Sequence, residues 1–97
     1  MAGWILQSLS ETPVIIRLAP GSVRTLGRTA HADFILDAAL VSRVHCRLTA
    51  DKSDQLVVED LSSTNGTMVN GERVERQLLK PGDRVTVGRV DFEVVQG

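Results

Sequence analysis

Four side chains in this sequence could together bind a phosphate group: two arginines and two residues with hydroxyls, all close to the ends of short apolar runs. Arg28 closes the segment VRTLGR, Ser42 and Arg43 open SRVH, and Thr64 lies in STNGT. Guanidiniums give charge-assisted hydrogen bonds to anions, and hydroxyls add directional ones. Because loops gather at the two ends of a β-sandwich, we expect these residues to meet in one binding site.

A catalytic interpretation of the same region is weaker. Ser42 and His45 could act as nucleophile and base, but residues three apart in a strand or turn usually face different ways. Together with His31 and Cys46, the histidine fits no common zinc spacing. The chain also lacks a nucleophile elbow, a Walker A loop and a dinucleotide fingerprint. We therefore expect no enzymatic activity, no catalytic residues, no metal and no cofactor.

The composition is that of one folded domain over residues 1–97. Hydrophobic residues make up 42% and charged residues 24%, too apolar for disorder and too charged for a membrane protein. The net charge of -1 predicts no direct binding to nucleic acid or to a membrane. A single cysteine excludes an internal disulfide, and the N-terminus lacks the basic region of a secretory signal. We expect a cytoplasmic location, or a nucleocytoplasmic one in a eukaryote.

Short β-branched runs separated by turn signals indicate an all-β fold. Nine runs are expected to be strands: residues 4–9, 14–18, 23–26, 34–36, 44–50, 55–60, 67–69, 84–88 and 90–95. In the run 44–50, a period of two places Val44, Cys46 and Leu48 on one face and His45 on the other. Close strand spacing favours an antiparallel sandwich or barrel, in which the first and last runs could pair.

The order of the polar motifs resembles that of the forkhead-associated (FHA) domain family, from about residue 15 to residue 95. The resemblance rests on Gly27-Arg28, Ser42-Arg43 with His45, EDLSSTNGTMVNG (59–71) and LKPGDRVTVG (79–88). It implies an antiparallel β-sandwich of about eleven short strands with binding loops at one end. It also implies a module that binds phosphothreonine peptides in extended conformation.

The resemblance implies a role for each binding residue. Arg28 would contact the phosphate or the peptide backbone, and Ser42 and Thr64 would donate hydrogen bonds to the phosphate. Arg43 occupies a position that often joins this cradle. Asn65 would hold the peptide main chain beside the phosphothreonine.

Five further residues are expected to support the site: Gly27, His45, Gly66, Asn70 and Gly71. The resemblance implies that His45 packs behind the loop and that Gly66 lets the loop bend. Asn and Gly tolerate positive φ at low cost, so Asn70-Gly71 predicts the tight turn of a hairpin whose second strand begins near Glu72.

The expected partner is a phosphothreonine-containing protein, bound by a monomer or a weak homodimer. The loop DAALV (37–41) departs from the family, which often has a polar pair before the valine. The resemblance implies that this loop contacts the peptide about three residues after the phosphothreonine, where Leu40 predicts an apolar preference. His31 is interpreted as a solvated loop residue, with a peptide contact as the alternative. The alternative function is a phospho-independent scaffold or dimerisation sandwich, which apolar side chains on an outer sheet face would favour.

Overall fold

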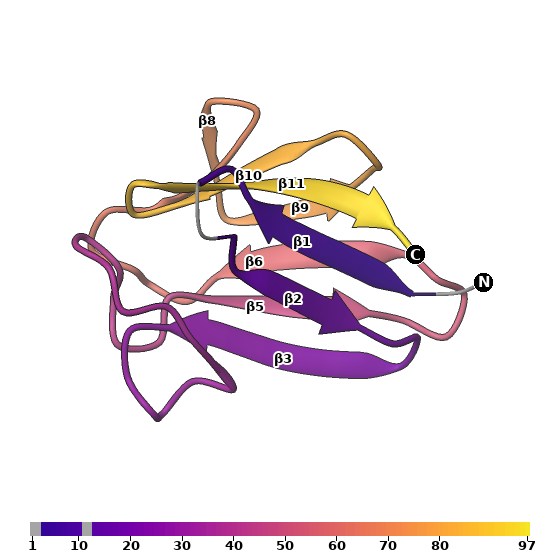
Figure 1. The fold of residues 1–97 in the computed structure, drawn as a ribbon, viewed down its shortest axis with the longest axis horizontal. Helices are drawn as coiled ribbons and strands as arrows, with labels where there is room; N and C mark the ends of the chain where they lie inside the picture. The colour runs from indigo at the N-terminus through magenta and orange to yellow at the C-terminus, as the bar shows by residue number, and fades with distance from the viewer. Residues whose placement is uncertain (1–2, 11–12) are drawn as a thin grey trace.

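The computed structural model describes residues 3–10 and 13–97, which form eleven strands (Figure 1). In chain order these are β1 (Trp4–Ser8), β2 (Ile15–Leu18), β3 (Ser22–Gly27), β4 (Phe34–Ile35), β5 (Cys46–Ala50), β6 (Leu56–Asp60), β7 (Thr67–Val69), β8 (Glu72–Val74), β9 (Arg76–Leu79), β10 (Arg84–Val87) and β11 (Val90–Gln96). Within these ranges no helix is long and apolar enough to cross a membrane.

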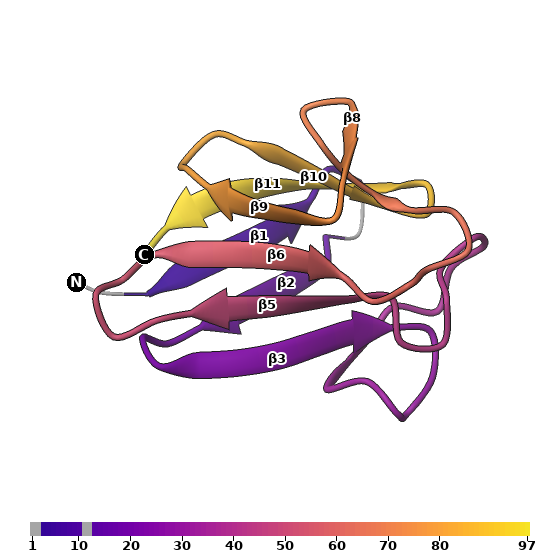
Figure 2. The same cartoon turned by 180° about the vertical axis from the view of Figure 1, so that it is seen from behind.

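The strands form two sheets that pack face to face. One sheet has the order β2-β1-β11-β10-β7-β8 and lies toward the viewer in Figure 1, and the other has the order β4-β3-β5-β6-β9 and is in front in Figure 2. All pairings are antiparallel except that of β3 with β4. The sandwich of eleven strands expected from the sequence is confirmed.

The core between the sheets follows from alternation along the strands. In β1 and β5, every second residue is buried, as the period of two requires, and the same alternation places Leu56 and Val58 of β6 and Phe92 and Val94 of β11 in the core. The largest fully buried apolar side chains are Phe92, Leu6, Ile16, Leu18, Leu26, Leu48, Leu56, Val58, Val85, Val87 and Val94. Burial raises the pKa of the Cys46 thiol to about 12, with the negative charge of Asp60 adding to the effect. Cys46 is therefore a core residue and not a reactive thiol.

One prediction about the fifth strand is wrong. Alternation placed Val44 with Cys46 on one face and His45 on the other. Instead β5 begins at Cys46, Val44 is half-buried, and both His45 and Cys46 are fully buried. The backbone bends at Arg43 and Val44, so the period of two does not extend to these residues.

The ninth strand is not among the runs expected from the sequence. β9 lies at the edge of its sheet beside β6, in register from Leu56 with Leu79 to Glu59 with Arg76. Three of its four residues are exposed. An edge strand with a single buried side chain lacks the apolar alternation on which the sequence prediction depended.

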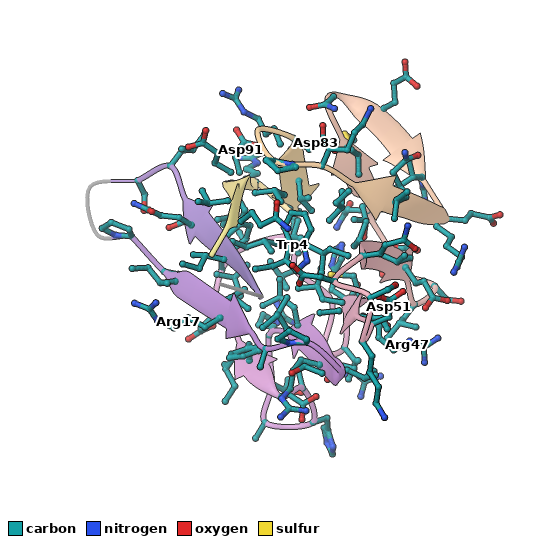
Figure 3. All side chains as sticks on the ribbon, turned by 90° about the vertical axis from the view of Figure 1, so that its right-hand side faces the viewer. Trp4, Arg17, Arg47, Asp51, Asp83 and Asp91 are labelled. Carbon is teal, nitrogen blue, oxygen red and sulfur yellow. The ribbon has the colours of Figure 1, made fainter. Side chains whose placement is uncertain are left out.

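The two terminal strands pair, as expected, and a turn from the other sheet fastens them. β1 and β11 align from Trp4 with Gln96 to Ser8 with Phe92. Asp54 accepts hydrogen bonds from the Gly3 N–H and the Gln96 amide, each at 3.0 Å. Figure 3 looks onto this end of the sandwich, with Trp4 near its centre. The loops of interest for function lie at the opposite end of β5 and β6.

Candidate functional site

A cleft of about 650 Å³ lies where three loops meet: those between β3 and β4, between β4 and β5, and between β6 and β7. Figure 2 shows these loops together at one end of the sandwich. The residues around the cleft are Arg28, His31, Leu40, Val41, Ser42, Arg43, Val44, Ser62, Thr64 and Asn65. All five residues predicted to bind a phosphopeptide are among them. Residues far apart in sequence therefore share one concave surface.

Hydrogen bonds join the second and third loops directly. The Thr64 N–H donates to the Ser42 Oγ at 3.0 Å, and the Asn65 Nδ2 donates to the Leu40 carbonyl at 3.1 Å. The Ser42 hydroxyl accepts the bond from Thr64, so its own hydrogen remains available as a donor. The two loops thus hold both hydroxyl residues at the cleft.

His45 lies under these loops and connects them from below. Its Nδ1 accepts a hydrogen bond from the Ser42 N–H at 3.0 Å, and its Nε2 is 2.8 Å from the Gly66 carbonyl. Since Nδ1 accepts, Nε2 must carry the hydrogen and donate it to that carbonyl. Both ring nitrogens are engaged with backbone groups, so the imidazole is not placed to take a proton from the Ser42 hydroxyl.

The two arginines of the cleft are exposed, while their backbones are fixed. The Arg28 N–H donates to the Ser42 carbonyl at 2.9 Å, and the Thr29 N–H donates to the Arg43 carbonyl at 3.3 Å. Within residues 3–10 and 13–97, the one salt bridge joins Arg47 to Glu59. Neither guanidinium of the cleft is therefore neutralised by a described carboxylate, and both can meet an anionic ligand.

Gly27 allows the first loop to approach the second. A Cβ atom at this position would lie 2.2 Å from the Arg43 carbonyl oxygen, closer than non-bonded atoms approach. Gly66 is required for another reason, because its φ of 85° lies in the left-handed region. These two glycines shape the loops around the cleft, and neither of them lines it.

Asp60 holds the third loop in place through hydrogen bonds, a role that was not expected from the sequence. Its carboxylate accepts hydrogen bonds from the Ser63 N–H at 3.1 Å, from the Ser63 hydroxyl, and from the Thr67 hydroxyl at 2.8 Å. Burial raises the pKa of Asp60, but these hydrogen bonds outweigh burial and hold the pKa below its ordinary value. The pattern of an aspartate followed three residues later by serine is a local signal for such a brace.

The two Asn-Gly pairs have different surroundings. Asn70 and Gly71 have φ values of 52° and 85° and connect β7 to β8 in a two-residue turn, as predicted. The Asn70 side chain also donates to the Asp83 carboxylate at 3.1 Å and accepts from the Arg84 N–H at 3.0 Å. Asn65, in contrast, is exposed at the cleft.

His31 is an exposed residue of the first loop, as expected, and the structure adds that it lines the cleft. Its place at the cleft was not the first expectation from the sequence, because the β3–β4 loop carries no motif at this position. Among the described residues, no group of three or more His, Cys, Asp or Glu side chains could hold a metal ion.

Comparison with known proteins gives matches in both sequence and structure. A family model described as FHA domain matches residues 24–88. The chain is 40% identical, over 82% of its length, to an ABC transporter ATP-binding/permease protein of Mycobacterium tuberculosis. It is 37% identical, over 78% of its length, to the glycogen accumulation regulator GarA of the same organism. These matches cover 9% and 46% of the two relatives, so the chain spans less than half of either protein.

Solved structures show the same fold. An FHA domain from a study of phosphothreonine-dependent FHA domain interactions aligns with a TM-score of 0.90 and 30% identity, over 99% of this chain and 98% of that one. The FHA domain of CT664 from Chlamydia trachomatis gives 0.92 at 24% identity, over 99% of both chains. The N-terminal FHA domain of Saccharomyces cerevisiae Rad53p, in complex with a phosphothreonine peptide, gives 0.83 at 24%, over 99% of this chain and 94% of that one.

Proposed function

The chain belongs to the FHA domain family of phosphothreonine-peptide-binding modules, and we propose that its cleft is the site at which it binds the phosphopeptide. In this proposal Arg28, Ser42, Arg43 and Thr64 contact the phosphate. Asn65 holds the main chain of an extended peptide beside the phosphothreonine. The observation that carries the proposal is the convergence of these five residues, from three loops, on one cleft.

The chemistry of the cleft supports a dianionic ligand. Phosphothreonine carries a charge of about -1.5 to -2 at pH 7. Two exposed guanidiniums and three hydroxyls, those of Ser42, Ser62 and Thr64, surround the cleft, and no aspartate or glutamate lines it. A ligand of that charge would therefore find donors on several sides and no repelling carboxylate.

The Asn65 side chain supports the peptide contact. Its Nδ2 donates to the Leu40 carbonyl, so the orientation of the amide is set by the protein. The Oδ1 of Asn65 is left as an acceptor for a peptide N–H at the exposed edge of the cleft. A preorganised amide loses less conformational entropy when it binds an extended backbone.

The proposal extends to the chain as a whole. We propose that residues 1–97 act as one domain without enzymatic activity, in the cytoplasm, and without direct contact with nucleic acid or membrane. The partner in this proposal is a protein phosphorylated on threonine.

A pair of peptides tests the proposal. Titration calorimetry would compare a phosphothreonine peptide with its unphosphorylated twin on the wild-type chain, on Arg28→Ala and on the control Arg17→Ala, whose arginine lies on β2 outside the cleft. We expect binding of the phosphorylated peptide alone. Arg28→Ala should weaken binding by about ten- to a hundredfold, since a hydrogen bond to a charged group contributes about 1.5–3 kcal/mol. Equal binding of the twins, or equal effects of the two substitutions, would refute the proposal.

One observation favours the alternative, a phospho-independent dimerisation module. On the outer face of the second sheet, the pairings align Val23, Thr49, Val57 and Leu78 in one row across four strands. Val23 and Leu78 are 49% and 46% exposed. Sedimentation over a dilution series, with Leu78→Ser as the variant, would detect a dimer built on this row.

A further inference from the structure

The side chain of His31 lies at the cleft but has no part in the proposed phosphate contacts. It is exposed and lines the same surface as Arg28 and Arg43. We propose that His31 is a specificity-determining residue that recognises an acidic side chain of the phosphopeptide close to the phosphothreonine. This inference rests on the function proposed for the cleft.

Thr29 fixes the position of His31 relative to the proposed phosphate site. The Thr29 hydroxyl donates to the Arg43 carbonyl at 3.2 Å and accepts from the His31 N–H at 3.4 Å. One hydroxyl therefore links the backbone of His31 to that of Arg43. The Ala32 N–H donates to the Thr29 carbonyl at 3.0 Å and closes the turn around His31. Although the imidazole is exposed, its backbone is held at a defined place on the rim.

The charge around His31 favours an acidic partner. The ionisable residues that line the cleft are Arg28, Arg43 and His31, and no carboxylate is among them. The closest carboxylate in sequence, Asp33, accepts hydrogen bonds from the N–H and hydroxyl of Thr25. Imidazole donates a hydrogen bond in either protonation state and adds positive charge when protonated. An aspartate or glutamate of the peptide would thus meet donors and no like charge.

His31 and Leu40 line the cleft from different loops, the β3–β4 loop and the β4–β5 loop. The Leu40 carbonyl is bonded to Asn65, whereas His31 is linked through Thr29 to Arg43. In Figures 1 and 2 the loop after β3 lies at the lower edge of this end, and the loop between β6 and β7 lies above it. His31 and Leu40 would therefore read different positions of an extended peptide.

The test uses phosphothreonine peptides in which one position at a time, among the three on each side of the phosphothreonine, is Asp, Asn or Lys. On the wild-type chain we expect Asp to bind about two- to fivefold more tightly than Asn at one or two positions, as for an exposed ion pair. His31→Gln should reduce that preference, and His31→Glu should reverse it toward Lys. The control Lys52→Gln removes one positive charge in the turn between β5 and β6, at the far end of the sandwich, and should leave the preference unchanged.

The outcomes separate this inference from the function on which it rests. If phosphothreonine-dependent binding persists but no position shows an Asp preference that depends on residue 31, the inference about His31 is wrong and the proposed function stands. If Lys52→Gln alters the Asp preference as much as His31→Gln does, the preference comes from long-range electrostatic attraction. His31 then makes no specific contact with the peptide. If the phosphorylated and unphosphorylated peptides bind alike, both the inference about His31 and the proposed function are wrong.

Discussion

The Ser42 hydroxyl accepts a hydrogen bond from the Thr64 N–H at 3.0 Å, so the two hydroxyl residues proposed to hold phosphate are joined directly across two loops. His45 reinforces the connection from beneath, because it accepts from the Ser42 N–H and donates to the Gly66 carbonyl. Such a linked arrangement lowers the entropy lost on binding. Ser42 is therefore expected to affect both the ligand and the loops.

Ser42→Ala is predicted to weaken phosphopeptide binding by about tenfold or more, because a donor to a charged group and the acceptor for Thr64 are both lost. The free energy of unfolding should fall by only about 1 kcal/mol, the typical net contribution of one hydrogen bond. Calorimetry and urea unfolding measure the two effects. Ser62→Ala is the control, since Ser62 lines the same cleft and its side chain forms no hydrogen bond with the described residues. Equal losses of affinity in the two variants would contradict the prediction.

Replacing Gly27 or Gly71 by alanine is predicted to lower the free energy of unfolding by different amounts, because the two glycines are required for different reasons. Gly27→Ala places a Cβ atom 2.2 Å from the Arg43 carbonyl oxygen, so the first loop must move, and we expect a loss of about 3 kcal/mol or more. At Gly71 nothing lies within 4 Å of a new Cβ, and only the φ of 85° is unfavourable. Gly71→Ala should cost about 1–2 kcal/mol. Similar unfolding free energies for the two variants would show that the close approach at Gly27 does not limit stability.

Much of this fold could be predicted from local patterns. The turn at Asn70-Gly71 follows from dihedral preference, and strands such as β10 and β11 follow from alternation against a core. Strand β9 could not be predicted, because it is held by pairing with β6 and contributes only Leu79 to the core. Edge pairing leaves little trace in the sequence of the edge strand.

In the candidate site, too, some residues could be predicted from the sequence and others could not. Arg28, Ser42 and Thr64 belong to motifs with a recognisable order, whereas His31 reaches the cleft because Thr29 is bonded to the backbone of Arg43. That contact joins loops 14 residues apart in sequence. No pattern local to the β3–β4 loop indicates it.

Asp60 gives a prediction about pH. Its pKa is lowered in the folded chain, so its ionised form stabilises the fold above the unfolded value near 3.9, and this contribution is lost as the pH falls through the folded pKa. Asp60→Asn removes an acceptor for Ser63 and Thr67 and should cost about 1–3 kcal/mol near pH 7.

The difference in unfolding free energy between wild type and Asp60→Asn should therefore narrow as the pH is lowered below about 4. Urea unfolding at several pH values between about 3 and 7 measures it. Asp51→Asn is the comparison variant. The pKa of Asp51 is also lowered, but its carboxylate accepts hydrogen bonds from Ser53 and Gln55 within its own turn, at the far end of the sandwich from the cleft. If the difference in unfolding free energy between wild type and Asp60→Asn grew as the pH fell, ionised Asp60 would not be the form that stabilises the fold.

The side chain of Leu40 predicts an apolar preference at the peptide position about three residues after the phosphothreonine. Its side chain is 42% exposed at the cleft, and its backbone is held at a φ of 68° with its carbonyl bonded to Asn65. An oriented phosphopeptide library should be enriched in apolar residues at that position, because apolar contact is favourable there. Leu40→Arg should shift the enrichment toward Asp or Glu. Selection of Asp by the wild-type chain would overturn the prediction.

The two asparagines that precede glycine are predicted to separate binding from stability. Asn70→Ala loses two side-chain hydrogen bonds, to Asp83 and Arg84, and leaves alanine at a φ of 52°, so the free energy of unfolding should fall by about 2 kcal/mol with little change in affinity. Asn65→Ala loses one exposed bond to Leu40 and the proposed contact with the peptide backbone, so affinity should fall about tenfold or more while stability changes by less than about 1 kcal/mol. Urea unfolding and peptide titration on both variants give the comparison. If Asn65→Ala unfolded the domain and Asn70→Ala abolished binding, the roles assigned to the two pairs would have to be exchanged.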